Sequence, residues 1–248
     1  MKRIIAAIDN SAAARPVLVM ADAVAKALAG TRDAVHVIED GDETARASAE
    51  ATGARLRMLS GDPVEQLTLA VSDEDAVAVV LGARGSPGGP RPAGHVALAL
   101  AGVTDKPVVV VQPDVAPTPT LRRVLIAMEG SPGKDRALKR TVRLAADARL
   151  ELVVVHVDEE IPNFTDQIQH ETTSYAREFV AKHVLDTPLA QLDLRIGVPA
   201  AQVLGAIDEF HPDLVCVGWP QVDDPSRGAV AREILDRSPV PVLLIAVQ

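Results

Sequence analysis

The segment RIIAAIDNS at residues 3–11 decides the fold, because the chain repeats it in altered form as VLIAMEGS at residues 124–131. Four more pairs of segments follow in the same order: AVHVIED (34–40) and VVHVDE (154–159), SGDPVEQL (60–67) and RIGVPAAQVL (195–204), AVAVVLGARG (76–85) and LVCVGWPQ (214–221), and KPVVVVQ (106–112) and VPVLLIAV (240–247). The offset is 120 residues from Asp9 to Glu129, 136 from Gly61 to Gly197 and 134 from Pro107 to Pro241. A repeat kept in order, with offsets that change only in the connecting segments, indicates two copies of one domain.

Length and composition agree with two domains. The chain has 248 residues, of which 48% are hydrophobic, so each copy of about 120 residues can bury a core of its own. We expect domains at residues 1–113 and 121–248, joined by a linker at 114–120 that its prolines keep semi-extended.

Charge and hydropathy exclude several classes of partner. The formal net charge is −9 and both copies are acidic, which gives no electrostatic support for binding nucleic acid. No apolar run approaches the roughly 20 residues of a membrane helix, and the N-terminus lacks the pattern of a signal peptide. The single cysteine, Cys216, excludes a disulfide framework within the chain. We expect a cytoplasmic protein that binds neither nucleic acid nor membrane.

Each copy alternates β-rich runs with amphipathic segments. In the first copy we expect strands at 3–8, 34–38, 54–59, 77–81 and 108–112, and helices at 15–29, 63–71 and 96–102. Continuous Val, Ile and Leu runs are typical of strands buried on both faces. The predicted fold class is therefore α/β, with two tandem doubly wound domains, each a five-stranded parallel sheet flanked by helices. Sixteen added residues in the second copy predict a long helix at 165–185, whereas 40–54 predicts a short or frayed one.

A ligand of such a sheet binds at the carboxyl ends of the strands, beside the point where the strand order reverses. Two features of the first copy meet there: Asp9, which ends the first strand, and the loop GARGSPGGPRPAGHV at 82–96, which leads into a helix. The loop and the helix N-terminus could hold a phosphate. Ordinary turn chemistry explains the same glycines and prolines equally simply, so both interpretations stay open.

Both copies resemble the universal stress protein family over essentially the whole chain. The motifs that carry the resemblance are Asp9-Asn10-Ser11, His36-Val37, Gly61-Asp62-Pro63 and Pro107-Val108-Val109 in the first copy, and Glu129-Gly130-Ser131, His156-Val157, Gly197-Val198-Pro199 and Pro241-Val242-Leu243 in the second. The family pairs its final strands across a two-fold axis. The resemblance thus implies that the strands at 107–111 and 241–245 meet within this chain, and it leaves a further homodimer open.

ATP-binding members of that family carry Gly-x-x-Gly, nine residues, and then Gly-Ser or Gly-Thr. The first copy keeps both glycines of Gly-x-x-Gly, but only eight residues precede Gly94, and a histidine replaces the hydroxyl residue. The resemblance implies a weak ATP site, with Mg²⁺ bound only together with ATP, at Asp9, Val37, Gly82, Arg84, Gly85, Gly94, His95 and Val96. His95 and Arg84 are the candidate phosphate donors that replace the hydroxyl.

The second copy departs further from the ATP-binding pattern. Trp219, Pro220 and Gln221 follow Gly218, so the second glycine is lost, and Ala229 stands where the hydroxyl residue belongs. Proline also lacks the amide that a phosphate would use. The resemblance therefore implies a degenerate site, and we expect Trp219 to fill it.

No residue set predicts catalysis or a structural metal. The six histidines lack metal-ligand spacing, and neither Ser11 nor Ser131 lies in a G-x-S-x-G motif. We expect His36 and His156 to have structural roles. The predicted function is a non-enzymatic stress-response module with a weak adenine-nucleotide site in the first copy. The alternatives are a nucleotide-independent scaffold and, with less support, an enzyme of the adenine-nucleotide hydrolase type.

Overall fold

The computed structural model describes residues 1–38, 41–83, 94–112, 114–116, 118–128, 135–158, 174, 178, 190–221 and 228–247. The first half contains β1 (Arg3–Ala7), α1 (Ala14–Ala27), β2 (Thr31–Ile38), α2 (Glu43–Ala51), β3 (Leu56–Ser60), α3 (Pro63–Ser72), β4 (Ala76–Gly82), α4 (His95–Val103) and β5 (Val108–Val111). The second half contains β6 (Arg123–Met128), α5 (Asp135–Asp147), β7 (Glu151–Asp158), β8 (Ala190–Ile196), α7 (Pro199–Phe210), β9 (Leu214–Pro220), α8 (Ala229–Arg237) and β10 (Val242–Val247).

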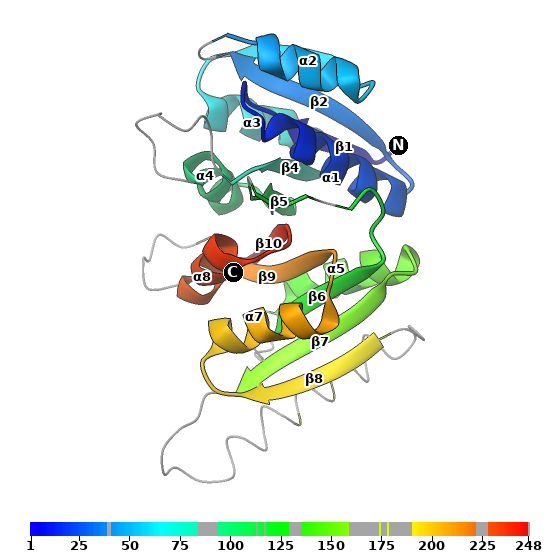
Figure 1. Ribbon diagram of the computed structural model, residues 1–248, viewed down its shortest axis with the longest axis vertical. Helices are drawn as coiled ribbons and strands as arrows, with labels where there is room; N and C mark the ends of the chain where they lie inside the picture. Colours follow the sequence, from blue (N-terminus) through cyan, green and yellow to red (C-terminus); the bar gives the residue numbers. More distant parts are fainter. Residues whose placement is uncertain are drawn as a thin grey trace.

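The described strands form one ten-stranded sheet, in the order β3-β2-β1-β4-β5-β10-β9-β6-β7-β8. Neighbouring strands are parallel within each half, but β5 and β10 pair antiparallel, with Val109 opposite Leu243. This antiparallel pair of β5 and β10, which we call the seam, lies at the centre of the molecule, between the two halves (Figure 1). The predicted fold class is confirmed, as is the pairing of the two final strands within the chain. The strand order reverses between β1 and β4, and again between β6 and β9.

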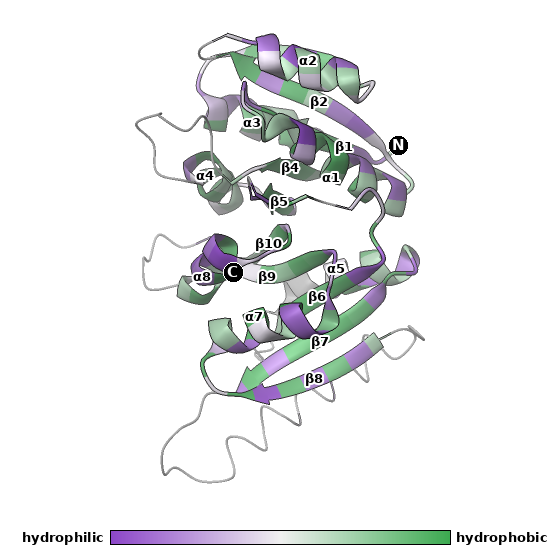
Figure 2. Ribbon diagram, viewed as in Figure 1, coloured by the Kyte–Doolittle hydropathy of each residue, from purple (hydrophilic) through white to green (hydrophobic). Residues whose placement is uncertain are grey.

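The sheet buries an apolar core on each face, and both cores run through the two halves. Along β1, Ile4 and Ala6 belong to one core and Ile5 to the other. Helices α1, α2 and α5 contribute to the first core, and α3, α4, α7 and α8 to the second. Figure 2 shows hydrophobic strands on both sides of the seam. Burial on both faces accounts for the continuous Val, Ile and Leu runs of the sequence.

Helix α1 ends in a turn that the second half repeats. Ala29 has a φ of 50°, and the Gly30 N–H donates to the Ala25 carbonyl at 2.8 Å, which closes the helix. The left-handed residue is thus Ala29, one position before the glycine. Gly30 serves a different need, because a Cβ there would lie 2.6 Å from the Lys2 carbonyl oxygen. Arg149, 120 residues after Ala29, has a φ of 57°.

Helix α3 begins where its sequence predicts. The Asp62 carboxylate accepts hydrogen bonds from the backbone N–H groups of Val64 at 3.0 Å and Glu65 at 3.1 Å. Pro63 takes the first helical position, where a missing N–H leaves no bond unmade.

The segments that connect the second and third strands differ between the halves. Residues 40–54, expected to be short or frayed, contain the nine-residue α2. The long helix predicted at 165–185 falls almost entirely outside the described residues.

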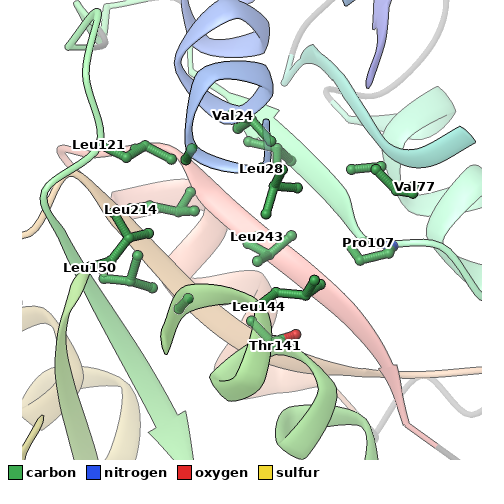
Figure 3. A pocket seen from close by; sticks show the side chains of 15 residues that line it. Val24, Leu28, Val77, Pro107, Leu121, Thr141, Leu144, Leu150, Leu214 and Leu243 are labelled. Carbon is green, nitrogen blue, oxygen red and sulfur yellow. The ribbon is translucent and has the colours of Figure 1, made fainter. Parts of the chain in front are cut away.

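An apolar cavity of about 70 Å³ lies at the seam, between α1 and α5. Figure 3 shows Val24 and Leu28 of the first half facing Leu144 and Leu243 of the second across it. Thr141 supplies the one side-chain hydroxyl of the lining. Such a hydrocarbon lining offers a phosphate almost no donors, so this cavity is not the candidate nucleotide site.

Candidate functional site

The carboxyl ends of β1, β2 and β4 meet at one edge of the sheet. The last register pairs are Ala7 with Val35 and Ala7 with Leu81. Asp9 follows β1, Val37 lies near the end of β2, and Gly82 ends β4. The structure therefore brings these three predicted residues to the point where the strand order reverses, which is the expected place for a ligand.

Asp9 organises the turn that leads from β1 into α1. Its Oδ1 accepts hydrogen bonds from the Ser11 N–H at 3.2 Å and the Ser11 hydroxyl at 2.6 Å. The Ser11 oxygen in turn accepts from the Ala13 N–H at 3.2 Å. Within the described ranges, both bonds to Asp9 end on Oδ1, which leaves Oδ2 able to accept from a ligand hydroxyl or amine.

Asn10 is a structural residue of this edge that the sequence did not reveal. Its Oδ1 accepts from the backbone N–H groups of Thr44 at 2.7 Å and Ala45 at 3.2 Å, so it caps α2 from another element. The helix's own N-cap residue, Asp42, makes no side-chain capping bond. The cap joins residues more than 30 positions apart, and no local pattern marks such a pair.

His36 fixes the same edge from inside the core. Its Nδ1 lies 2.8 Å from the Ile8 carbonyl oxygen and its Nε2 lies 3.1 Å from the Gly41 carbonyl oxygen. The buried ring thereby ties the end of β1 to the residues before α2. In the second half the corresponding distances are 3.0 Å from His156 Nδ1 to the Met128 carbonyl and 3.2 Å from Nε2 to Asp158 Oδ1. These contacts agree with the structural roles predicted for both histidines.

Helix α4 starts beside the end of β4. Gly94 is its N-cap residue, with a φ of 77°, and a Cβ there would lie 3.4 Å from the Ala83 carbonyl oxygen. His95 opens the first turn with an exposed side chain, and Val96 follows, half-buried. The other two predicted residues, Arg84 and Gly85, lie outside the described residues. The N-terminus of α4 thus lies beside the end of β4, at the edge of the sheet where Asp9 and Val37 also lie.

The equivalent edge of the second half is filled by an indole ring. Trp219 belongs to β9 rather than to the loop after it, and it is 5% exposed. Gly228, the N-cap of α8, has a φ of 84°, and its Cβ position lies 3.4 Å from the Trp219 ring and 3.2 Å from Pro220. The Arg232 guanidinium covers the ring at 5.3 Å from its centroid. Apolar atoms therefore occupy the helix start that would otherwise meet a phosphate.

Other reactive groups in the described part of the chain have structural surroundings. No three His, Cys, Asp or Glu side chains gather there as a metal site. Burial raises the pKa of the Cys216 thiol, which keeps it protonated.

At the opposite edge of the sheet, Arg3 pairs with Asp73 at 2.5 Å and Asp75 at 3.0 Å. The bond to Asp73 is the main reason that the pKa of Arg3 is raised. None of the described helices has the length and hydropathy needed to cross a membrane.

Comparison with known proteins identifies the family and the fold. The model of the universal stress protein family matches residues 120–246. A universal stress protein from Archaeoglobus fulgidus DSM 4304 aligns over 98% of both chains, with a TM-score of 0.70 and 18% identity. A Pseudomonas aeruginosa UCBPP-PA14 protein assigned to the same family aligns over 100% of this chain and 94% of its own, with a TM-score of 0.72 and 15% identity. No curated protein matches the chain.

Proposed function

The chain belongs to the universal stress protein family, and we propose that it is a non-enzymatic binding module with one weak adenine-nucleotide site. The first half, as a domain of residues 1–113, holds ATP together with Mg²⁺ at the edge where β1, β2 and β4 end. The second half, as a domain of residues 121–248, is closed to nucleotide. Binding rather than turnover is the function that this arrangement supports best.

The difference between two helix starts carries the proposal. Gly94 and Gly228 have the same left-handed conformation at the N-termini of α4 and α8. At Gly228 the nearest atoms belong to Pro220 and the Trp219 ring, whereas at Gly94 the nearest described atom is the backbone oxygen of Ala83. Helix N-termini attract phosphate through their free N–H groups. Among the described residues, therefore, only the N-terminal N–H groups of α4, in the first half, can be reached by a phosphate without apolar atoms in the way.

Asp9, at the end of β1, also supports a nucleotide site in the first half, because β1 and β4 flank the point where the strand order reverses. Its Oδ2 can accept a hydrogen bond from a ribose hydroxyl or from the adenine amine, while Oδ1 holds the turn. Binding is expected to be weak, because His95 replaces the hydroxyl residue of ATP-binding relatives and one loop residue is missing. We place the dissociation constant in the micromolar range or above.

Calorimetric titration with ATP and Mg²⁺ tests the proposal. The wild type should bind one nucleotide, and Asp9→Ala should weaken binding by tenfold or more, because a hydrogen bond to a charged group contributes roughly 1.5–3 kcal/mol. Glu129→Ala is the matched control, since Glu129 is the sequence counterpart of Asp9 in the closed half. Absence of heat at millimolar ATP, or equal weakening by both substitutions, would contradict the proposed site.

A nucleotide-independent scaffold is the second candidate function. It is favoured by His95 in place of the hydroxyl residue and by the two bonds that already occupy Asp9 Oδ1. The two candidates differ in a simple observation. Equilibrium dialysis of the purified protein against millimolar ATP and Mg²⁺ should leave an excess of nucleotide on the protein side if the first candidate holds, and no excess if the second does.

A further inference from the structure

We infer that Gln221 of the second half is a positioning residue for α4, and through α4 for the nucleotide site of the first half. The inference rests on the proposed function. On this inference the second half, whose own site is closed, holds in place the helix α4 that the first half uses to bind nucleotide.

A hydrogen bond across the seam is the basis of this inference. The Gln221 side-chain amide donates from Nε2 to the Thr104 carbonyl oxygen at 2.8 Å. Thr104 is the C-cap residue of α4 and is 6% exposed. Its own N–H donates to the Leu100 carbonyl at 3.0 Å, and its hydroxyl oxygen accepts from the Lys106 N–H at 3.1 Å. Thr104 is therefore fixed to its helix, to the approach of β5 and to the second half.

Helix α4 rests on both halves of the sheet. It contacts β5 of its own half and also β9 and β10 of the other. Leu100 is fully buried in the core that these strands share. The other end of the helix carries Gly94 and His95. Because nine residues at 1.5 Å each span only about 13 Å, a shift at the C-cap is passed to the N-terminus as a rigid-body motion.

Among the described residues, no side chain of the first half makes the equivalent bond to Ser238, and the first half instead crosses the seam through Gln112, which donates to the Leu235 carbonyl. Ser238, which corresponds to Thr104, makes the same local turn, with its hydroxyl 3.2 Å from the Val240 N–H. The residue that corresponds to Gln221 is Gly85, which has no side chain with which to reach Ser238. In the second half, Gln221 thus stands in place of the second glycine of the Gly-x-x-Gly motif. Its side-chain amide supports α4 of the first half.

Gln221→Ala tests the inference in the full-length chain. The variant loses the donor, and ATP binding by calorimetry should weaken roughly 2- to 10-fold, which is the range for one neutral hydrogen bond. Backbone amide exchange of Leu98 and Thr104 in α4 should become faster without nucleotide. The matched control is Gln112→Ala, because Gln112 also crosses the seam but donates to the Leu235 carbonyl at 3.1 Å, in α8. The control should leave both readouts within twofold of wild type.

The outcomes separate this inference from the proposed function. Unchanged affinity and exchange in Gln221→Ala would overturn it, as would equal effects of the two variants, which would indicate general loosening of the seam. A second equivalent of ATP bound by Gln221→Ala would show that Gln221 closes its own half instead. If the wild type binds no ATP, the proposed function fails, yet faster exchange in α4 of Gln221→Ala alone would still confirm that Gln221 holds the helix.

Discussion

At the scale of the residue, His95 sits where relatives that bind ATP carry a hydroxyl, and its side chain is exposed at the start of α4. We expect His95→Ser to strengthen nucleotide binding, because it restores a donor at the helix N-terminus, where anions already gather. The gain should be about three- to tenfold in the calorimetric dissociation constant. His95→Ala is the control and should give no gain.

The opposite result would assign His95 a role of its own. If His95→Ser weakens binding, and the wild type binds better as the pH falls, the imidazolium is itself a phosphate contact. A loss that is independent of pH would indicate only that the serine is out of reach.

Trp219 offers a second test at this scale, since it is the only tryptophan of the chain and reports on the second half alone. Its ring is 5% exposed and lies against the start of α8. We expect ATP, at concentrations that saturate the calorimetric signal, to leave its emission maximum and its quenching by acrylamide unchanged. Increased quenching would mean that the ring swings out and that the second half also admits nucleotide.

The sequence predicted some of these residues and missed others for a physical reason. Asp9, Val37 and Gly82 could be placed at one edge because parallel strands end together at the carboxyl side of a sheet. The bonds of Asn10 to α2 and of Gln221 to Thr104 join elements far apart in the chain. Such side-chain partners depend on tertiary packing, which a single sequence does not display.

At the scale of the element, the caps of α3 and α7 provide a matched experiment. Asp62 and Val198 precede a proline in the two copies and have nearly the same backbone conformation, with φ and ψ of −68° and 129° against −70° and 117°. Only Asp62 makes side-chain capping bonds. We expect Asp62→Ala to lower the free energy of unfolding by about 1 kcal/mol and Val198→Asp to raise it by a similar or smaller amount.

Urea denaturation of the two variants measures both effects. Val198 is 66% exposed, so its replacement costs little apolar burial. Thr68→Ala, a substitution within α3 but away from its cap, controls for general perturbation of that helix. No change from Val198→Asp would show that the second copy satisfies these N–H groups by another route.

Element positions followed from the sequence more closely than element ends. The alternation of strands and helices was predicted from apolar periodicity and from the turn residues, as at Asp62-Pro63. The helix expected at 15–29 ends at Ala27, because Ala29 takes the left-handed turn and the approach of Lys2 requires Gly30. In the second half, β9 continues through Trp219 to Pro220, because these residues pair with Ala246 and Val247 of β10.

At the scale of the whole molecule, the seam turns two repeated domains into one folded body. The pair β5–β10 lies at the centre of the sheet, and each apolar core includes residues of both halves. The repeat in the sequence predicted the two copies, and the family resemblance predicted that their final strands meet. Neither predicted that α4 rests on strands of the other half or that a small apolar cavity remains between α1 and α5.

Shared cores predict that the two halves unfold together. Leu18, in α1 of the first half, is fully buried, and its replacement by alanine should cost about 2–5 kcal/mol. Far-UV circular dichroism reports on both halves, whereas Trp219 fluorescence reports on the second alone. In urea, Leu18→Ala should shift the midpoints of both signals equally to lower concentration, because loss of the first half exposes β10 and both cores. Leu69→Ala makes the same change at a 58% exposed position and should shift neither appreciably. If the fluorescence midpoint of Leu18→Ala stays at the wild-type value while the dichroism separates into two steps, the halves are independent domains, and the seam is a contact rather than a shared core.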